Sequence, residues 1–203
     1  MTAASVALLL VSGSLRAGST NSAVLRTAQA LAPRDVEASF YAGMGELPHF
    51  NPDDDAEGQA IHPAVALMRT SVARADALLV CTPEYAGALP GALKNLLEWT
   101  VGDAGTYEKP VGWINAAGPA APTGAADAHA SLGKVLGYVG ADVVGSACRR
   151  IPITRRDVGE DGLIADAKAR VAIRATVAAL ADHVRRNRQA RGTEVGAPAA
   201  RRP

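Results

Sequence analysis

Five short apolar segments alternate with longer amphipathic segments along this chain. Each apolar segment is hydrophobic without interruption rather than at every second position, which predicts strands that are covered on both faces. The strict alternation predicts an α/β fold, a doubly wound parallel sheet of five strands with right-handed crossovers. The predicted strands are residues 6–11, 36–41, 77–81, 111–115 and 143–147, and the predicted helices are residues 21–31, 63–74, 90–101, 125–139 and 165–186.

The number of strand–helix units selects among the doubly wound folds. Five units predict the smaller variant, with strand order 2-1-3-4-5. The alternative is a six-stranded dinucleotide-binding domain, which needs one more unit than the pattern contains. In a sheet of order 2-1-3-4-5, ligands bind at the carboxyl ends of the strands, beside the first strand. We therefore expect the functional site on the loops that follow the first, third and fourth strands.

Composition and charge narrow the class of protein. Of the 203 residues, 48% are hydrophobic and 20% are charged, which is ordinary for a globular domain. The formal net charge of +1 offers no electrostatic surface for nucleic acid or anionic membrane. The first apolar segment lacks a basic head and is far shorter than the ~20 residues that cross a bilayer. We expect a cytoplasmic protein that binds small molecules and keeps Cys81 and Cys148 reduced.

Two stretches fall outside the strand–helix pattern. Residues 187–203 are rich in Arg, Gly, Pro and Ala, so we expect one domain at residues 1–186 followed by a disordered tail. A partner-binding arm is the alternative for this tail. Residues 43–62 form a long loop, and loops of this length are usually binding loops or disordered. On a binding loop, His49 and Phe50 would shape a pocket; otherwise they pack on the base of their own loop.

The loop after the first strand, residues 13–21, combines glycines with hydroxyls, an amide and a cation. Converging backbone N–H groups and a helix N-terminus favour an anion. The loop lacks the Walker lysine and the G-x-G-x-x-G spacing, so a terminal monophosphate fits better than ATP or a dinucleotide. The alternative is a polar turn in which Asn21 only caps the helix. The polar candidates are Ser14, Arg16, Ser19, Thr20 and Asn21.

Two further loops face this one across the predicted sheet. Residues 82–91 follow the third strand; Pro83 and Pro90 stiffen this loop, Tyr85 offers a flat face and Gly87 permits close backbone approach. Such a loop suits the edge of a planar heterocycle, although Tyr85 could instead cover the core. Residues 115–124 follow the fourth strand, and their small side chains leave space for a large ligand.

These loops resemble those of the NADPH-dependent FMN reductase family, flavodoxin-like proteins that include quinone, azo and chromate reductases. The resemblance covers residues 5–185 and is carried by two long motifs in the family's order. The first is Gly13-Ser14-Leu15-Arg16 with Ser19 and Asn21. The second is Pro83-Glu84-Tyr85 with Pro90-Gly91, Leu93-Lys94-Asn95 and Trp99.

The resemblance implies FMN as the cofactor and NADPH or NADH as the electron donor. It assigns the FMN phosphate to Ser14, Arg16, Ser19, Thr20 and Asn21, and the isoalloxazine ring to Pro83, Glu84, Tyr85, Ala86 and Gly87 together with Asn115, Ala116 and Gly118. It further implies a homodimer, or a homotetramer built from two dimers, paired through the helices at residues 90–101 and 125–139.

Two positions depart from the family pattern. Ala86 stands where the family commonly carries Asn, so any hydrogen bond from that side chain is lost. Glu98 stands where Asp usually precedes the tryptophan, which is a milder change.

The predicted function is an FMN-dependent NAD(P)H oxidoreductase that passes hydride to a quinone, a flavin or a similar acceptor with ping-pong kinetics. The alternative is a flavodoxin-like electron carrier or flavin-binding module without enzymatic activity. We nominate no catalytic side chain, because the cofactor carries the redox chemistry. We also nominate no metal ligand. The acidic residues 53–55 are typical of a loop exposed to water, and no two of the four histidines have the sequence spacing of metal ligands.

Overall fold

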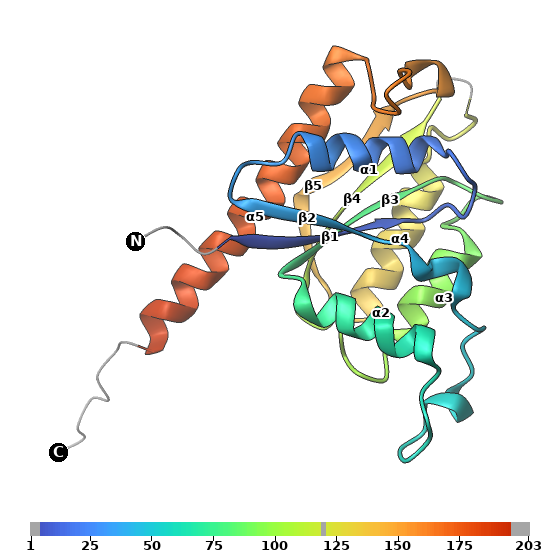
Figure 1. The fold of residues 1–203 in the computed structure, drawn as a ribbon, viewed down its shortest axis with the longest axis vertical. Coiled ribbons are helices and arrows are strands. Elements are labelled where there is room, and N and C mark those ends of the chain that lie inside the picture. The colour runs from blue at the N-terminus through green and yellow to red at the C-terminus, as the bar shows by residue number, and fades with distance from the viewer. Residues whose placement is uncertain (1–4, 119–120, 196–203) are drawn as a thin grey trace.

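Parallel pairing of five strands organises the chain (Figure 1). The computed structural model describes residues 5–118 and 121–195. All four strand pairs are parallel, and the order is β2-β1-β3-β4-β5. The predicted fold class, strand number and strand order are therefore confirmed. The strands are β1 (Val6–Ser12), β2 (Val36–Tyr41), β3 (Ala77–Thr82), β4 (Pro110–Ala117) and β5 (Asp142–Pro152).

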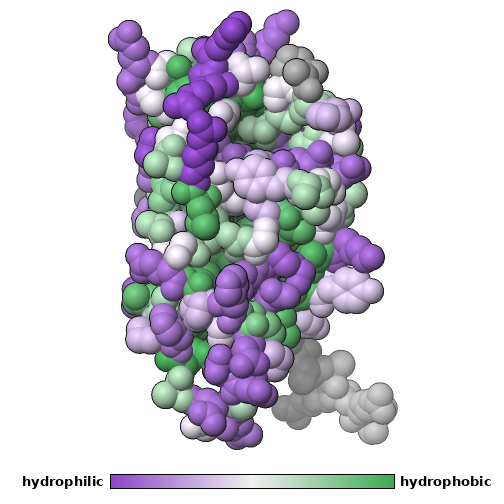
Figure 2. Space-filling view, turned by 90° about the vertical axis from the view of Figure 1, so that its right-hand side faces the viewer, coloured by the Kyte–Doolittle hydropathy of each residue, from purple (hydrophilic) through white to green (hydrophobic). Residues whose placement is uncertain are grey.

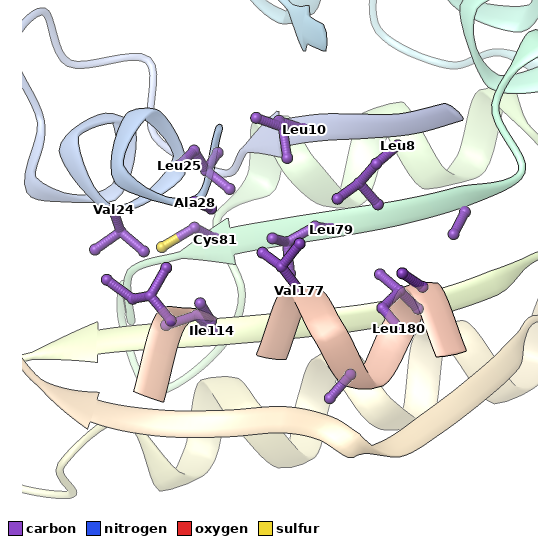
Figure 3. Packing of buried hydrophobic residues seen from close by; sticks show 14 of the residues in the cluster. Leu8, Leu10, Val24, Leu25, Ala28, Leu79, Cys81, Ile114, Val177 and Leu180 are labelled. Atoms are coloured by element: carbon purple, nitrogen blue, oxygen red, sulfur yellow. The ribbon is translucent and has the colours of Figure 1, made fainter. Parts of the chain in front are cut away.

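Helices cover both faces of the sheet. One face carries α1 (Thr20–Ala30) and α5 (Ala167–Val195), and the other carries α2 (Pro63–Arg74), α3 (Gly91–Trp99) and α4 (Ala126–Tyr138). In Figure 3, Leu79 of β3 lies beside Val177 of α5, and both belong to one buried cluster with Ile114 of β4 and Val24 of α1. All residues of the central strand β3 are buried, which explains its uninterrupted apolar sequence.

The edge strand β5 is longer than predicted. Val143 pairs with Val111, but Cys148 pairs with Trp113, so β5 bulges between these two positions. At the bulge, Gly112 packs so closely that a Cβ on it would lie 2.7 Å from the Cβ of Ala147. Beyond the bulge β5 continues to Pro152 and reaches the carboxyl edge of the sheet beside β4.

The predicted end of the last helix at Arg186 is wrong. Helix α5 continues to Val195, and residues 196–203 of the predicted tail lie outside the described part of the chain. Arg188 forms an ion pair with Asp76 at 2.7 Å and donates to the carbonyl of Ser5 at 3.1 Å. Contacts across 183 residues of sequence cannot be read from local composition, which here suggested a tail.

The long loop at residues 43–62 is docked on α3. The carbonyl oxygen of Pro48 accepts from Trp99 Nε1 at 2.9 Å and from Asn95 Nδ2 at 2.8 Å. Phe50 lies edge-on to Trp99, with ring centroids 5.0 Å apart, and its N–H donates to Asn95 Oδ1 at 2.8 Å. Phe50 therefore packs on α3, and its predicted place in a pocket stays a prediction.

Between residues 5 and 195, leaving out 119–120, no helix is long and apolar enough to cross a membrane. Within the same ranges no group of three or more His, Cys, Asp or Glu side chains is arranged to hold a metal ion.

Candidate functional site

The loops after β1, β3 and β4 meet at the carboxyl edge of the sheet. The N–H of Gly13 donates to the carbonyl of Cys81 at 2.8 Å, which ties the end of β1 to β3. A Cβ on Gly13 would overlap the hydroxyl of Thr82, so only glycine fits this approach. Figure 2 faces this edge: pale and hydrophobic residues occupy its middle, and hydrophilic side chains lie both above and below them.

The first loop borders a cavity of about 530 Å³. Ser14 and Arg16 line this cavity, and Ser14 Oγ accepts from the N–H of Arg16 at 3.3 Å. Hydroxyls, an exposed guanidinium and the N-terminus of α1 together suit a dianionic phosphate. The other lining residues are Ser12, Leu15, Ala17, Gly18, Ser22, Arg26, Phe40, Tyr41, Ala42, Met44 and Gly45.

The remaining candidates of the first loop lie behind the cavity. Ser19 is the N-cap of α1, and its Oγ accepts from the N–H of Ser22 at 3.1 Å. Thr20 is the first residue of the helix. Asn21 is buried, and its Oδ1 accepts from Cys81 Sγ at 3.4 Å. The alternative in which Asn21 caps the helix is thus wrong, because Ser19 has that role.

Tyr41 is a residue of this cavity that the sequence analysis missed. Its hydroxyl is buried and has no hydrogen-bond partner among the described residues. Burial, and then the nearby Glu46, raise the pKa of Tyr41 to about 12. The position of Tyr41 at the end of β2, next to β1 across the predicted ligand crevice, was the available signal.

The second loop is a tight hairpin. The N–H of Tyr85 donates to the carbonyl of Ala88 at 3.0 Å, and the N–H of Ala88 returns a bond to Tyr85 at 3.1 Å. Between them Ala86 and Gly87 have φ of 50° and 72°, the left-handed pair that such a two-residue turn requires. Tyr85 is 52% exposed at the site, so it does not cover the core. Pro83 is half-buried where β3 runs into the hairpin.

Glu84 points away from the tip of this hairpin and joins it to the third loop. Its carboxylate accepts from Thr123 Oγ1 at 2.6 Å and from the N–H of Ala128 at 3.0 Å. These bonds, that of Thr123 first, lower the pKa of Glu84. Ala125 is the N-cap of α4 and provides no side-chain cap, so Glu84 supplies the acceptor from another loop. The side chain of Glu84 fixes the second and third loops relative to each other, and its predicted contact with the ring stays a prediction.

The third loop begins at the buried Asn115, which pairs with Thr82 across the sheet. Ala116 and Gly118 follow at the half-buried end of β4. Asn115 Nδ2 donates to the carbonyl of Thr82 at 3.4 Å, and its Oδ1 lies 2.9 Å from His129 Nδ1. The three loops thus lie at one edge of the sheet. Ser14 and Arg16 line the cavity of the first loop, whereas Ser19, Thr20 and Asn21 are not among its lining residues.

His129 is a second residue that the sequence analysis set aside. Its Nδ1 lies 3.0 Å from Trp113 Nε1, which only donates, and 2.9 Å from Asn115 Oδ1, which only accepts. Accepting from Trp113 requires an unprotonated Nδ1, and this bond excludes a simultaneous one to Asn115 Oδ1. Burial, and then the charge of Arg150, lower the pKa of His129. A neutral His129 therefore lies beneath Asn115 at the floor of the third loop.

The fold and the strand order define a flavodoxin-like protein. A sequence profile of NADPH-dependent FMN reductases matches residues 6–152, and the chain belongs to this family. The predicted family is thereby confirmed.

Individual relatives agree with this membership. An NAD(P)H-dependent FMN reductase of Pseudomonas aeruginosa is 42% identical over 94 residues, which cover 46% of this chain and 49% of that protein. A quinone reductase of Escherichia coli is 33% identical over 87 residues, 43% of this chain and 46% of that protein. The chain thus spans about half the length of these curated relatives. Among solved structures, the flavoenzyme FerB of Paracoccus denitrificans, an NAD(P)H:(acceptor) oxidoreductase, superposes with a TM-score of 0.77 at 28% identity, covering 89% of this chain and 97% of that chain.

Proposed function

We propose that this protein is an FMN-dependent NAD(P)H oxidoreductase that reduces quinones, flavins or similar small acceptors. The observation that carries the proposal is the cavity lined by Ser14 and Arg16 at the carboxyl edge, flanked by a left-handed hairpin and a loop of small residues. The named activities of the relatives, FMN reductase and quinone reductase, support the same reaction.

The residues present fit FMN. Ser14 and Arg16 would hold the phosphate, with the backbone N–H groups of the Ser19 turn. The orphaned hydroxyl of Tyr41 lies at the same cavity and is a hydrogen-bond donor without a protein partner among the described residues. Bound FMN supplies a ring that accepts a hydride and passes electrons on.

The protein itself contributes position rather than acid–base chemistry. The carboxylate of Glu84 holds the hairpin and the third loop at a fixed separation, and the buried Asn115 fixes the start of the third loop. The exposed tip of the hairpin presents the backbone of Ala86 and Gly87 to a ligand edge. Donor and acceptor would use one open ring face in turn, which is the basis of ping-pong kinetics.

The proposal includes a homodimer formed through α3 and α4. Between these helices lies a cavity of about 290 Å³ lined mainly by apolar side chains, including Leu97, Val101, Val135 and Tyr138. Tyr138 is 85% exposed and Val101 is 58% exposed, a large apolar face for a protein in water. We also place the protein in the cytoplasm, where the unpaired thiols of Cys81 and Cys148 stay reduced.

The test is a binding and turnover experiment on the purified protein. FMN, FAD and riboflavin are titrated by quenching of flavin fluorescence, and FMN is expected to bind most tightly. NADPH and NADH oxidation is then followed with benzoquinone, FMN and oxygen as acceptors. Turnover with benzoquinone supports the proposal. FMN binding without any NAD(P)H oxidation would favour the electron carrier, and tighter binding of FAD would contradict the assignment of the phosphate cavity.

A further inference from the structure

The outer edge of β5 carries a row of cations next to the candidate flavin site. β5 is the last strand of the sheet, so its far side has no neighbouring strand. Arg150 pairs in register with Asn115, and Pro152 pairs with Ala117. Because of the bulge in β5, the Arg149–Arg150 pair reaches the carboxyl edge where the third loop begins.

Two cavities lie along the carboxyl-terminal part of β5. A cavity of about 540 Å³ is lined by Gly118 and Gly124 of the third loop together with Arg150. A second cavity of about 500 Å³ is lined by Arg149, Arg150 and, from the start of α5, Lys168. Both cavities include Arg150, Ile151 and Pro152, so they adjoin along the open edge of β5. We call this pair of cavities the β5 groove.

The β5 groove is positively charged. Arg149, Arg150 and Lys168 are exposed, and among the described residues none of the three forms an ion pair. The guanidinium of Arg150 has one weak partner, the carbonyl of Thr123 at 3.5 Å. The single acid of the lining, Asp166, already accepts from the N–H of Ala169 at 2.7 Å and caps α5.

Three cations against the one carboxylate of Asp166 favour a multiply charged anion. Arginine suits phosphate because its planar guanidinium can donate two parallel hydrogen bonds. The groove starts at Gly118, beside the space assigned to the isoalloxazine ring, and leads away from it over the edge of the sheet. In Figure 2 hydrophilic side chains gather at the upper end of this face, where Figure 1 places the start of α5.

We propose that the β5 groove binds the adenosine 2′-phosphate of NADPH, and that Arg150, with Arg149 and Lys168, makes this enzyme prefer NADPH to NADH. The inference rests on the proposed function, since it assigns the donor's nicotinamide to the flavin loops and its adenosine end to the groove. Arg150 is thereby a specificity-determining residue that does not touch the reacting atoms.

The first test is a direct binding measurement that needs no turnover. Adenosine 2′,5′-bisphosphate and adenosine 5′-monophosphate are titrated into the protein by calorimetry. The bisphosphate is expected to bind more tightly, and Arg150→Ala is expected to weaken it about tenfold or more while hardly changing the monophosphate. Arg150→Lys should retain part of the affinity, because lysine keeps the positive charge but cannot donate the paired hydrogen bonds of a guanidinium.

The matched control is Arg74→Ala, an exposed arginine at the end of α2, at the opposite edge of the sheet. It removes the same charge from the protein without touching the groove. Equal affinity for the two nucleotides in the unmodified protein, or an equal loss in Arg74→Ala, would overturn the inference.

The second test is the ratio of kcat/KM for NADPH to that for NADH with one quinone acceptor. We expect this ratio to exceed one and to fall about tenfold in Arg150→Ala, through the KM for NADPH, while NADH kinetics stay unchanged. Equal use of both nucleotides in the unmodified protein contradicts only the groove assignment. Failure to oxidise either nucleotide contradicts the proposed function instead.

Discussion

The carboxylate of Glu84 lies 2.6 Å from the hydroxyl of Thr123 and joins two loops that are 39 residues apart in sequence. The same carboxylate receives the N–H of Ala128, at the first turn of α4. The side chain of Glu84 therefore connects the second loop, the third loop and the N-terminus of α4. The separation of the two loops at the candidate ring site depends on these bonds.

Glu84→Gln should reduce stability and remove part of its pH dependence. The pKa of Glu84 is lowered in the fold, so its contribution is complete above the carboxyl's ordinary pKa and is lost as the pH falls through the lowered value. In urea unfolding, the free energies of unfolding of Glu84→Gln and of the original protein should differ above about pH 5 and become equal in acid. Thr123→Val, which removes the leading partner, should cost about 1 kcal/mol near neutral pH. A Glu84→Gln protein as stable as the original at pH 7 would contradict the assignment.

Ala86→Asn should stabilise the protein by about 1 kcal/mol, because φ of 50° is unfavourable for alanine and tolerated by asparagine. Ala86→Gly should also relieve this strain. If only Ala86→Asn increases the stability, the increase comes from a hydrogen bond of the asparagine side chain. Thermal or urea unfolding measures both. The control is Ala130→Gly on the exposed face of α4, which should lose about 1 kcal/mol. A loss of stability in both Ala86 variants would exclude strain at this turn.

Arg16→Ala should weaken FMN binding about tenfold or more and leave riboflavin binding nearly unchanged, since it removes a charge-assisted contact to the phosphate alone. Fluorescence titration with both flavins gives the two dissociation constants. Arg34→Ala, an exposed arginine in the loop after α1, is the charge-matched control. Equal losses for FMN and riboflavin would show that Arg16 does not contact the phosphate.

His129 should titrate below the ordinary imidazole pKa of about 6.5, because burial and Arg150 both oppose its protonation. A lowered histidine pKa means that the associated stability is complete above the ordinary value and is lost as the pH falls through the lowered one. Protonation breaks the bond from Trp113, so tryptophan fluorescence should change with a midpoint below about 6.5. The transition should vanish in His129→Gln and persist in His183→Gln. A midpoint above the ordinary value would contradict the neutral state inferred for the fold.

Tyr138→Glu should convert the proposed dimer to a monomer, because it places a charge in the apolar face between α3 and α4. Light scattering at micromolar concentration measures the change. Leu67→Glu on α2, where the side chain is 66% exposed, is the matched control and should leave the mass unchanged. A monomeric, fully active unmodified protein would rule out the dimer.

The two residues that the sequence analysis missed at the site show the limit of motif reading. Tyr41 reaches the cavity from β2, and His129 reaches Asn115 from the first turns of α4. Neither stands in a loop with a recognisable spacing, and each becomes part of the site only when the strands pair. The motif identified Glu84 but could not show its bond to Thr123, because Thr123 belongs to another loop.

The sequence by itself determined the sheet. An uninterrupted apolar segment such as β3 is stable only when both faces of the strand are covered. Its alternation with helices therefore dictated a parallel, doubly wound sheet, and this sheet places the three candidate loops at one edge. Tertiary structure decided what depends on distant contacts: the extension of α5, held by Arg188 on Asp76, and the bulge that carries Arg150 to the level of Asn115. Local patterns encode which face of a segment is buried, but the register and the partners of polar side chains arise only when segments far apart in the chain pack together.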